Sequence, residues 1–333
     1  MEYVRFGSSG LRISRIALGM GLRGQRDERE AERLIRRAFD GGVNLFDCAN
    51  IYGPADDRAY AGHSEQILGR ALKSVRDEVV ITSKVVGQIG PGPNDRGASR
   101  YHIYREVERS LHRLGTDRID VYLLHSFDDQ TPLEEQFRAL DDLVQHGKVQ
   151  YVGVCNYQAW QVCHALWTQE RINAASLITV QNPYSLLNRR LEDEMFPMVR
   201  TLGLGVMAYA PLATGLLSGA YKVGQPAPAG TLWGDRRRGH LERVLAGQPG
   251  LVLTSVEEIA ARVSATVAQV ALKWALSRTE ISCVTSGADS DRQMDENLGA
   301  LDVKLSPEDI ATLDRASAGL TMTLDGPEFA APT

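Results

Sequence analysis

The sequence predicts a closed (β/α)8 TIM barrel, an α/β fold in which eight parallel strands alternate with helices. Two observations carry this prediction: short apolar runs alternate with longer amphipathic segments, and eight such units fit into 333 residues. A third is the hydrophobic fraction of 43%, which is enough for one large core. We therefore treat residues 1–333 as a single barrel domain. An open doubly wound sheet is the alternative, because the number of strands alone does not establish closure.

The predicted barrel strands are short and apolar, as expected for strands that are buried on both faces. They lie at Ile16–Leu18, Asn44–Phe46, Val79–Thr82, Val121–Leu124, Tyr151–Val154, Ile178–Val180, Val206–Ala208 and Cys283–Thr285. Between them, segments such as Ala31–Phe39 and Tyr104–Leu114 repeat apolar residues at the three- and four-residue spacing of a helix. The helix after the fourth strand is predicted to end at Gly147, which serves as its C-cap.

Two segments interrupt this regular alternation. Val4–Phe6 and Leu11–Ser14 flank Gly7-Ser8-Ser9-Gly10, which predicts a β-hairpin ahead of the first barrel strand. Between the seventh and eighth strands, residues from Leu212 to Val252 form a long loop insertion rich in Gly, Pro and Arg. Insertions of this length in compact domains usually act as lids or binding loops.

Charge, cysteine content and hydropathy argue against several classes of protein. The net charge is −5, which gives no reason to expect nucleic acid or an anionic membrane as the main partner. The four cysteines show no C-x-x-C spacing and no H-E-x-x-H motif occurs, so neither a disulfide framework nor a metal site is expected. The N-terminus lacks the pattern of a secretory signal, and no apolar run approaches the ~18 residues of a membrane span. We expect a cytoplasmic protein, and nothing in the pattern predicts its oligomeric state.

Four chemically distinct side chains lie just beyond successive predicted strands, where the loops of an α/β barrel converge on its active site. Asp47 follows the second strand, and Tyr52 lies five residues later. Lys84 follows the third strand, and His125 follows the fourth. Each alone has an ordinary structural explanation, such as a loop cap, a surface charge or a core histidine. Together they predict a catalytic site, because all four point toward one bowl.

The chemistry of this quartet is specific. A phenol has an ordinary pKa near ~10, and a neighbouring ammonium lowers that pKa because it favours the phenolate. A carboxylate keeps the ammonium charged and in place, and an imidazole can orient a substrate oxygen or relay its proton. Such a phenol is a general acid for carbonyl reduction and a general base for alcohol oxidation. Hydride chemistry then requires a cofactor.

A glycine-rich segment offers a different interpretation. Gly19-Met20-Gly21-Leu22-Arg23-Gly24 matches G-x-G-x-x-G after a strand, as in the phosphate-binding turn of a Rossmann unit, with Asp47 as the acidic residue of the next strand. However, residues 25–30 are polar and the apolar stripe starts only at Ala31, so no helix opens within the glycines. The motif therefore carries less weight than the barrel pattern.

Several motifs together resemble one known family. Asp47-Cys48-Ala49-Asn50-Ile51-Tyr52-Gly53 resembles the D-T-A-x-x-Y-G signature of the aldo-keto reductases. Further matches, in the family's order, are Ser64-Glu65 with Leu68-Gly69, Ser83-Lys84, Leu123-Leu124-His125 and Gly153-Val154-Cys155-Asn156. The resemblance runs from Phe6 to about Leu301, and the stretch from Pro211 to Gly219 is most similar to bacterial-type members.

The resemblance implies a barrel that binds NAD(H) or NADP(H) in extended form without a Rossmann domain. It implies Tyr52 as the catalytic acid or base, Lys84 and Asp47 as the groups that tune it, and His125 as the residue that positions the carbonyl. Asn156 and Gln181 match positions that bind the carboxamide, and Tyr209 matches the residue that stacks on the nicotinamide. The other implied cofactor-binding residues are Gly19, Met20, Asp47, Pro211, Leu212, Ser286, Gly287, Ala288, Asp289, Gln293, Glu296 and Asn297.

Some positions depart from the family pattern. Cys48 and Cys155 replace hydroxyl residues, and a thiol is a weaker hydrogen-bond donor. Ser286 replaces a proline, with little expected effect on the chemistry. Asp289 stands where relatives that prefer NADP commonly carry a basic residue, and a carboxylate there repels a 2′-phosphate but accepts hydrogen bonds from a free ribose hydroxyl. We therefore expect a slight preference for NAD, although Arg292 lies close by.

The predicted substrate pocket combines residues from several loops: Met20, Tyr52, His125, Phe127 and Trp233, with Leu22, Arg23, Gln88 and Ile89 as further wall candidates. The cluster Arg236-Arg237-Arg238 in the insertion is either a solvated loop face or a site that recognises a phosphate or carboxylate. A sugar or sugar-derived carbonyl is the first expectation for the substrate, and a small aldehyde or ketone is the second. The alternatives are a nicotinamide-binding regulatory subunit and a non-redox barrel enzyme such as a sugar isomerase or lyase.

Overall fold

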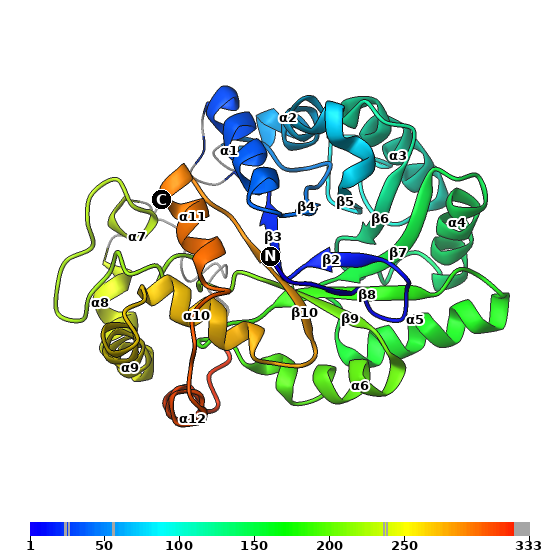
Figure 1. Ribbon diagram of the computed structural model, residues 1–333. Coiled ribbons are helices and arrows are strands. Elements are labelled where there is room, and N and C mark those ends of the chain that lie inside the picture. The colour runs from blue at the N-terminus through cyan, green and yellow to red at the C-terminus, as the bar shows by residue number, and fades with distance from the viewer. Residues whose placement is uncertain (23–24, 26, 55–56, 236, 238, 323–333) are drawn as a thin grey trace.

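Eight parallel strands form the closed barrel that the sequence predicts, and the open-sheet alternative is excluded (Figure 1). The computed structural model describes residues 1–22, 25, 27–54, 57–235, 237 and 239–322. Around the barrel the strands follow the order β10-β3-β4-β5-β6-β7-β8-β9. Their bounds are β3 Ile16–Gly19, β4 Leu45–Asp47, β5 Val80–Val85, β6 Ile119–Leu124, β7 Val149–Cys155, β8 Leu177–Pro183, β9 Gly205–Tyr209 and β10 Ile281–Ser286.

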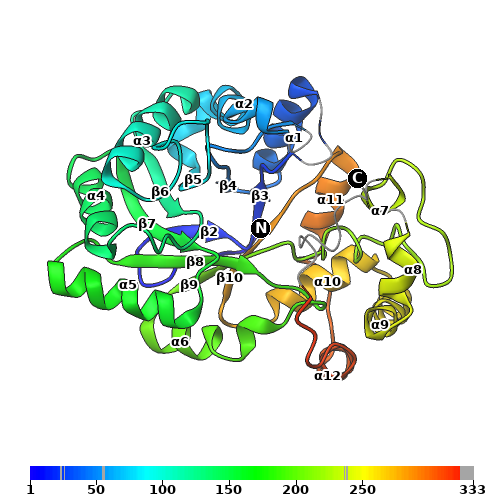
Figure 2. The same ribbon diagram turned by 180° about the vertical axis from the view of Figure 1, so that it is seen from behind.

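The helices surround the barrel, and their apolar stripes pack against the outside of the strands (Figures 1 and 2). They are α1 Glu28–Asp40, α2 His63–Leu72, α3 Arg100–Leu114, α4 Leu133–Gln145, α5 Ala159–Ile172, α6 Met195–Leu202, α7 Leu232–Asp235, α8 His240–Leu245, α9 Gln248–Arg262, α10 Val267–Leu276, α11 Asp291–Gly299 and α12 Pro307–Ala316. Short 3-10 segments lie at Arg58–Tyr60, Lys73–Glu78 and Arg190–Glu192. Within the described ranges, no helix is both long enough and apolar enough to cross a membrane.

No helix opens at the described residues of the glycine-rich segment, Gly19 to Leu22. Gly19 is the last residue of β3, and α1 begins only at Glu28, where the side chain of Asp27 accepts hydrogen bonds from the first turn. The Rossmann interpretation therefore fails on topology and on the position of this helix. The prediction for α4 was wrong by one residue: its C-cap is His146, and Gly147 follows with φ of +72°.

An antiparallel hairpin precedes the barrel, as predicted. Its strands are β1 (Tyr3–Arg5) and β2 (Arg12–Ser14). Phe6 and Ile13 join the apolar cluster inside the barrel, so the hairpin closes its amino-terminal end. Gly7 lies so close to β8 and β9 that an added Cβ would come within 2.1 Å of the Ile178 carbonyl oxygen, and its φ is +58°. Only glycine fits this position.

The insertion after β9 is more helical than the sequence suggested. Its predicted end at Val252 falls inside α9, which starts at Gln248 with Pro249 in the first turn, where proline is favourable. Trp233 in α7 is fully buried, and its indole N–H donates to the Thr214 carbonyl oxygen at 3.1 Å. This contact fastens the insertion to the turn that follows β9.

Candidate active site

A large cavity opens at the carboxyl ends of the barrel strands. Its volume is about 2310 Å³, well above the ~300–1,000 Å³ of a typical small-ligand pocket. Its wall is formed by the ends of β3, β4, β7, β8, β9 and β10 together with the insertion and α11. In Figures 1 and 2, α7 and α8 lie on the side of the barrel that also carries α9 and α11. The cavity therefore extends from the centre of the barrel toward this side.

Tyr52 and His125 meet on the wall of this cavity. The phenol oxygen of Tyr52 lies 3.2 Å from Nε2 of His125, and the two rings pack edge to face with their centroids 5.5 Å apart. Tyr52 lies on the loop after β4, and His125 directly follows β6, where its backbone N–H donates to the Val85 carbonyl oxygen. Two different loops thus bring a phenol and an imidazole into hydrogen-bonding distance.

A buried ion pair lies beside the phenol. Nζ of Lys84 is 2.8 Å from Oδ2 of Asp47 and 2.8 Å from the Cys48 carbonyl oxygen, and Lys84 has no exposed surface. The same ammonium lies 4.8 Å from the centroid of the Tyr52 ring. Burial lowers the pKa of Lys84, but the negative charge of Asp47 outweighs it and raises that pKa above its ordinary value. Lys84 therefore remains protonated at physiological pH.

The carboxylate of Asp47 accepts hydrogen bonds from two more strands. Thr82 donates its hydroxyl to Oδ1, and Nε2 of Gln181 donates to the same oxygen at 3.0 Å. The sequence interpretation did not include Thr82 in the site. A signal was present, because Thr82 lies two residues before Lys84 in a strand and therefore faces the same side. These donors satisfy the hydrogen-bonding capacity of the buried Asp47 carboxylate in place of water.

The predicted carboxamide-binding residues lie together on the cavity wall. Nδ2 of Asn156 donates to the His125 carbonyl oxygen at 2.9 Å, and its Oδ1 accepts the hydroxyl of Tyr209 at 2.8 Å. Oε1 of Gln181 accepts the thiol of Cys155 at 3.4 Å, so the thiol retains a weak version of the hydrogen bond that a hydroxyl would make. Asn156 has φ of +61°, a backbone conformation that asparagine tolerates better than most residues.

The segment between β10 and α11 forms one end of the cavity. Nδ2 of Asn297 donates to Ser286 Oγ and to the Gly287 carbonyl oxygen, both at 3.2 Å, which fixes the strand end to the helix. The backbone N–H of Asp289 donates to Oε1 of Gln293 at 2.7 Å. The predicted cofactor residues on this part of the wall are Ser286, Gly287, Ala288, Asp289, Gln293, Glu296 and Asn297.

Among the described residues, several predicted substrate-pocket residues lie away from the cavity wall. Phe127 packs edge to face against Tyr157 and Trp160, with ring centroids 5.2 and 5.8 Å away. Trp233 is buried within the insertion and does not line the cavity. Gln88 and Ile89 also lie off the wall. Met20, Leu22, Tyr52 and His125 do line the cavity, while Arg23, Arg236 and Arg238 lie outside the described residues.

The four cysteines differ in burial, which gives a direct test of the structure. Cys48, Cys155 and Cys283 are buried, and Cys163 on α5 is exposed. Burial raises the pKa of Cys155 to about 12, so its thiolate is scarce at pH 8. We expect the native protein to release one equivalent of thionitrobenzoate with Ellman's reagent at pH 8, and four after denaturation. Rapid reaction of a second thiol in the native state would contradict this burial.

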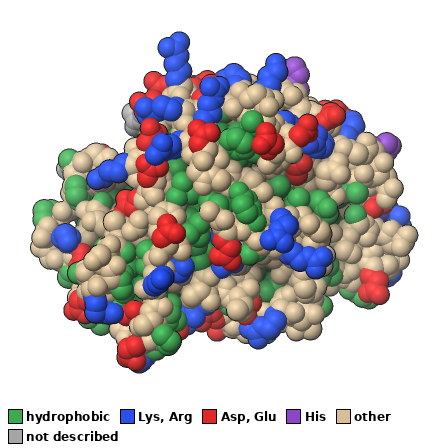
Figure 3. Space-filling model, viewed as in Figure 1, with side chains coloured by type: hydrophobic (Ala, Val, Ile, Leu, Met, Phe, Trp, Pro, Cys, Tyr) green, Lys and Arg blue, Asp and Glu red, His purple; other side chains and the backbone are tan. Residues whose placement is uncertain are grey.

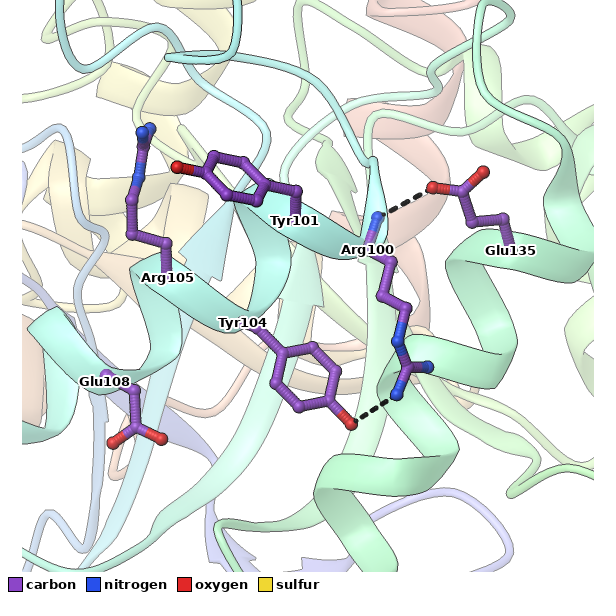
Figure 4. A pocket seen from close by; sticks show the side chains of 6 residues that line it. All are labelled: Arg100, Tyr101, Tyr104, Arg105, Glu108 and Glu135. Carbon is purple, nitrogen blue, oxygen red and sulfur yellow. Dashed lines mark hydrogen bonds between the residues drawn. The ribbon is translucent and has the colours of Figure 1, made fainter.

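A second, shallower pocket of about 680 Å³ lies on the outer face of α3 (Figure 4). Its side chains engage one another: Arg100 lies over the ring of Tyr104 at 4.6 Å, and Nη2 of Arg100 donates to the Tyr104 hydroxyl. None of the residues that line it belongs to the quartet at the barrel mouth. The cavity at the strand ends is therefore the candidate active site.

On the face drawn in Figure 3, acidic and basic side chains are interspersed, in keeping with the net charge of −5. Within the part of the chain that the structure describes, no cluster of His, Cys, Asp or Glu is arranged to hold a metal ion.

Comparison with known proteins places the chain in a family. The sequence profile described as "Aldo/keto reductase family" matches residues 15–318. An uncharacterized oxidoreductase of Bacillus subtilis, YrpG, is 36% identical over 94% of this chain and 95% of its own length. The L-glyceraldehyde 3-phosphate reductase of Escherichia coli K12 is 33% identical over 95% and 92%, and a probable voltage-gated potassium channel subunit beta of rice is 34% identical over 92% and 94%. The profile match and these identities show that the chain belongs to the aldo/keto reductase family of oxidoreductases.

Proposed function

We propose that this chain is an NAD(P)(H)-dependent oxidoreductase that interconverts a carbonyl and an alcohol on a sugar or a small aldehyde or ketone. The proposal treats the whole chain as one barrel domain. The observation that carries it is the phenol of Tyr52, 3.2 Å from the imidazole of His125 and beside the buried Lys84–Asp47 pair. A phenol held between an imidazole and an ammonium is a general acid or base, and it lines a cavity large enough for a dinucleotide together with a substrate.

In the direction of reduction, Tyr52 donates its phenol proton to the carbonyl oxygen as the carbonyl carbon becomes an alcohol carbon. The ammonium of Lys84 then stabilises the phenolate that remains, because it lies 4.8 Å from the ring centroid. His125 orients the substrate oxygen toward the phenol. In the direction of oxidation, the phenolate removes the alcohol proton. When bound, the nicotinamide supplies or accepts the hydride that the substrate carbon gains or loses.

The residues on the cavity wall fit an extended dinucleotide. The amides of Asn156 and Gln181 lie beside Tyr209, which suits a carboxamide and a flat ring. At the other end, the backbone amides that precede α11 suit an anionic group, because the N-terminus of a helix favours negative charge. Both ends lie on one continuous cavity, so a single extended ligand can reach both. The chemistry of these donors therefore agrees with a nicotinamide dinucleotide.

Asp289 supports a preference for NAD over NADP. Its side chain is exposed and, like Glu296, it lines the cavity, so a 2′-phosphate close to Asp289 would meet negative charge. We expect Asp289→Arg to tighten NADPH binding by roughly 5- to 100-fold, equivalent to about 1–3 kcal/mol, and to change NADH binding little. The measurement is a titration of each variant with NADH and NADPH, followed by tryptophan fluorescence.

Asp291→Ser is the matched control for this prediction. Asp291 lies two residues further along, does not line the cavity, and has its Oδ2 3.7 Å from Arg33. Asp291→Ser removes one negative charge close to Asp289 in the chain but off the cavity wall, so it should leave the ratio of NADH to NADPH affinity nearly unchanged. If wild type, Asp289→Arg and Asp289→Ser all show the same ratio of NADH to NADPH affinity, Asp289 does not determine the cofactor preference.

The relatives support a small, polar carbonyl substrate. One relative is named for the reduction of L-glyceraldehyde 3-phosphate, a sugar-derived aldehyde with a phosphate group. We therefore propose a sugar or sugar-derived carbonyl as the first substrate class, with simple aldehydes and ketones as the second. A preference for NAD favours oxidation in a cell, but only weakly.

A second candidate is a nicotinamide-binding regulatory subunit, because other relatives are named as probable potassium channel subunits at similar identity. A non-redox isomerase or lyase is the remaining alternative. One experiment separates the three: NADH and NADPH are mixed with the protein and glyceraldehyde, and both nucleotide binding and absorbance at 340 nm are followed. Binding with turnover supports the oxidoreductase, and binding without turnover of any tested carbonyl supports the subunit. If neither NADH nor NADPH binds, the oxidoreductase and the regulatory subunit are both excluded, and the isomerase or lyase remains.

A further inference from the structure

A buried carboxylate on α3 takes no part in the chemistry described so far. Glu106 has no exposed surface and does not line the cavity at the strand ends. Its Oε1 accepts a hydrogen bond from Nη1 of Arg109 at 2.9 Å, and its Oε2 accepts one from Nδ2 of Asn50 at 3.2 Å. Burying a carboxylate is costly unless it is paired and hydrogen-bonded. Arg109, which is exposed, compensates the charge, and the second oxygen is directed at Asn50.

Asn50 belongs to the loop that carries the phenol. We call residues 48–53, which follow β4, the Tyr52 loop. The backbone N–H of Asn50 donates to the Lys84 carbonyl oxygen at 3.3 Å, and that of Tyr52 donates to the Ala49 carbonyl oxygen at 3.2 Å. A backbone hydrogen bond thus ties the loop to β5, and the side chain of Asn50 ties it to α3.

The side chain of Asn50 depends on Glu106. Asn50 is fully buried, and among the described residues its Oδ1 has no hydrogen-bond partner. The bond from Nδ2 to Glu106 is therefore the one hydrogen bond that the described part of the chain provides for this amide. Removing the acceptor leaves a buried amide unpaired, which is unfavourable. The loop then gains free energy by moving toward another partner, such as water.

Small movements of this loop matter because the phenol must lie within hydrogen-bonding distance of the substrate oxygen. The phenol oxygen of Tyr52 is 3.2 Å from Nε2 of His125. Ile51 packs against Gly87, where an added Cβ would come within 2.8 Å of Ile51 Cγ2. Packing thus fixes the loop at Ile51, and the hydrogen bond to Glu106 fixes it one residue earlier. A displacement of about 1 Å at a reacting group can lower a rate by roughly 10²-fold.

We propose that Glu106 is a positioning residue for Tyr52. Through Asn50 it holds the Tyr52 loop where the phenol meets His125, although Glu106 itself does not line the cavity. The inference rests on the proposed function for the reaction in which the phenol takes part. Helix α3, on the outside of the barrel, thereby contributes to the rate of that reaction.

Three variants test this role. Glu106→Ala removes the acceptor, Glu106→Gln keeps an acceptor oxygen without the charge, and Asn50→Ala removes the donor. Asp309→Ala is the matched control, because Asp309 on α12 is also buried, is paired with Arg262, and lies off the cavity wall. Urea unfolding gives the stability of each variant. Asn50→Ala and Glu106→Gln keep the test available if Glu106→Ala does not fold.

The first readout is the split between rate and cofactor affinity. We expect Glu106→Ala and Asn50→Ala each to lower the steady-state kcat for glyceraldehyde by about 5- to 50-fold, with NADH affinity within about twofold of wild type. The double variant should be no slower than Glu106→Ala, because both changes remove the same hydrogen bond. Glu106→Gln should recover most of the wild-type kcat.

The second readout is amide hydrogen exchange in peptides that cover the Tyr52 loop, measured by mass spectrometry. Exchange in this loop should be about tenfold faster in Glu106→Ala than in wild type, because the loop opens more often. Asp309→Ala should keep both the kcat and the loop exchange of wild type, even where urea unfolding shows that it is destabilised.

The proposal is overturned if Glu106→Ala keeps kcat and loop exchange within about twofold of wild type. It is also overturned if Asp309→Ala loses kcat to the same extent, since the loss then follows stability alone. Failure of the proposed function has a different signature. In that case the wild type binds no nicotinamide nucleotide and turns over no carbonyl, yet loop exchange still responds to Glu106→Ala and not to Asp309→Ala.

Discussion

Tyr52→Phe is expected to lower kcat for aldehyde reduction by about 10²- to 10⁴-fold, the usual contribution of a positioned general acid. The substitution removes one oxygen atom and leaves the ring, so the edge-to-face contact with His125 remains. NADH affinity should stay within about twofold of wild type, because the phenol serves proton transfer. The measurement is the steady-state rate with saturating NADH and glyceraldehyde, combined with a fluorescence titration of the cofactor.

Tyr60→Phe provides the control for loss of a phenol near the same loop. Tyr60 is 46% exposed and packs against His63, outside the cavity wall. It should retain wild-type kcat. A Tyr52→Phe protein that keeps more than a tenth of the wild-type kcat would assign the proton transfer to another group, with His125 as the first candidate.

Lys84→Met is expected to destabilise the protein by about 3–5 kcal/mol, because it leaves the carboxylate of Asp47 buried without its ammonium partner. It should also lower kcat strongly, since the phenolate of Tyr52 loses the neighbouring positive charge. Urea unfolding followed by circular dichroism gives the free energy of unfolding, and steady-state kinetics below the unfolding transition give kcat.

Two further variants separate a charge effect from a packing effect. Lys148→Met breaks a partly exposed ion pair with Glu108, which should cost no more than about 1 kcal/mol. The double variant Asp47→Asn/Lys84→Met buries no unpaired charge, so it should be more stable than Lys84→Met while remaining poorly active. If Lys84→Met is no less stable than Lys148→Met, the buried pair does not contribute as the structure indicates.

The barrel strands were predictable because a strand that is buried on both faces is encoded by a short run of apolar residues. In β6 every residue from Ile119 to Leu124 is buried, and the stretch after Asp120 is an uninterrupted apolar run. The positions of Asp47, Lys84 and His125 then followed from the rule that polar residues after parallel strands converge. The family motifs strengthened this prediction, and the structure brings Tyr52 and His125 into contact.

The walls of the site were less predictable, because they depend on contacts between distant segments. The hydrogen bond between Gln181 and Asp47 exists only because barrel closure brings β8 and β4 to face each other. Trp233 lies in the long insertion, which suggested a pocket wall, yet the structure buries it, with its indole N–H donating to the Thr214 carbonyl oxygen. Its neighbour Arg237 lies on the wall instead. No periodic pattern distinguishes these outcomes within an irregular insertion.

The hairpin at the start of the chain bears on how the protein assembles during translation. β1 and β2 leave the ribosome before the barrel strands, but Gly7 packs against Ile178 and Gly205, which are synthesised much later. The first barrel strand, β3, can pair with β10 only after β10 has been synthesised, since Ile16 is in register with Val284. Pairing between such distant segments is slow, and the apolar faces of the early strands stay unprotected in the meantime. Nascent chains that stall before β10 are therefore expected to depend on chaperones and to be prone to aggregation.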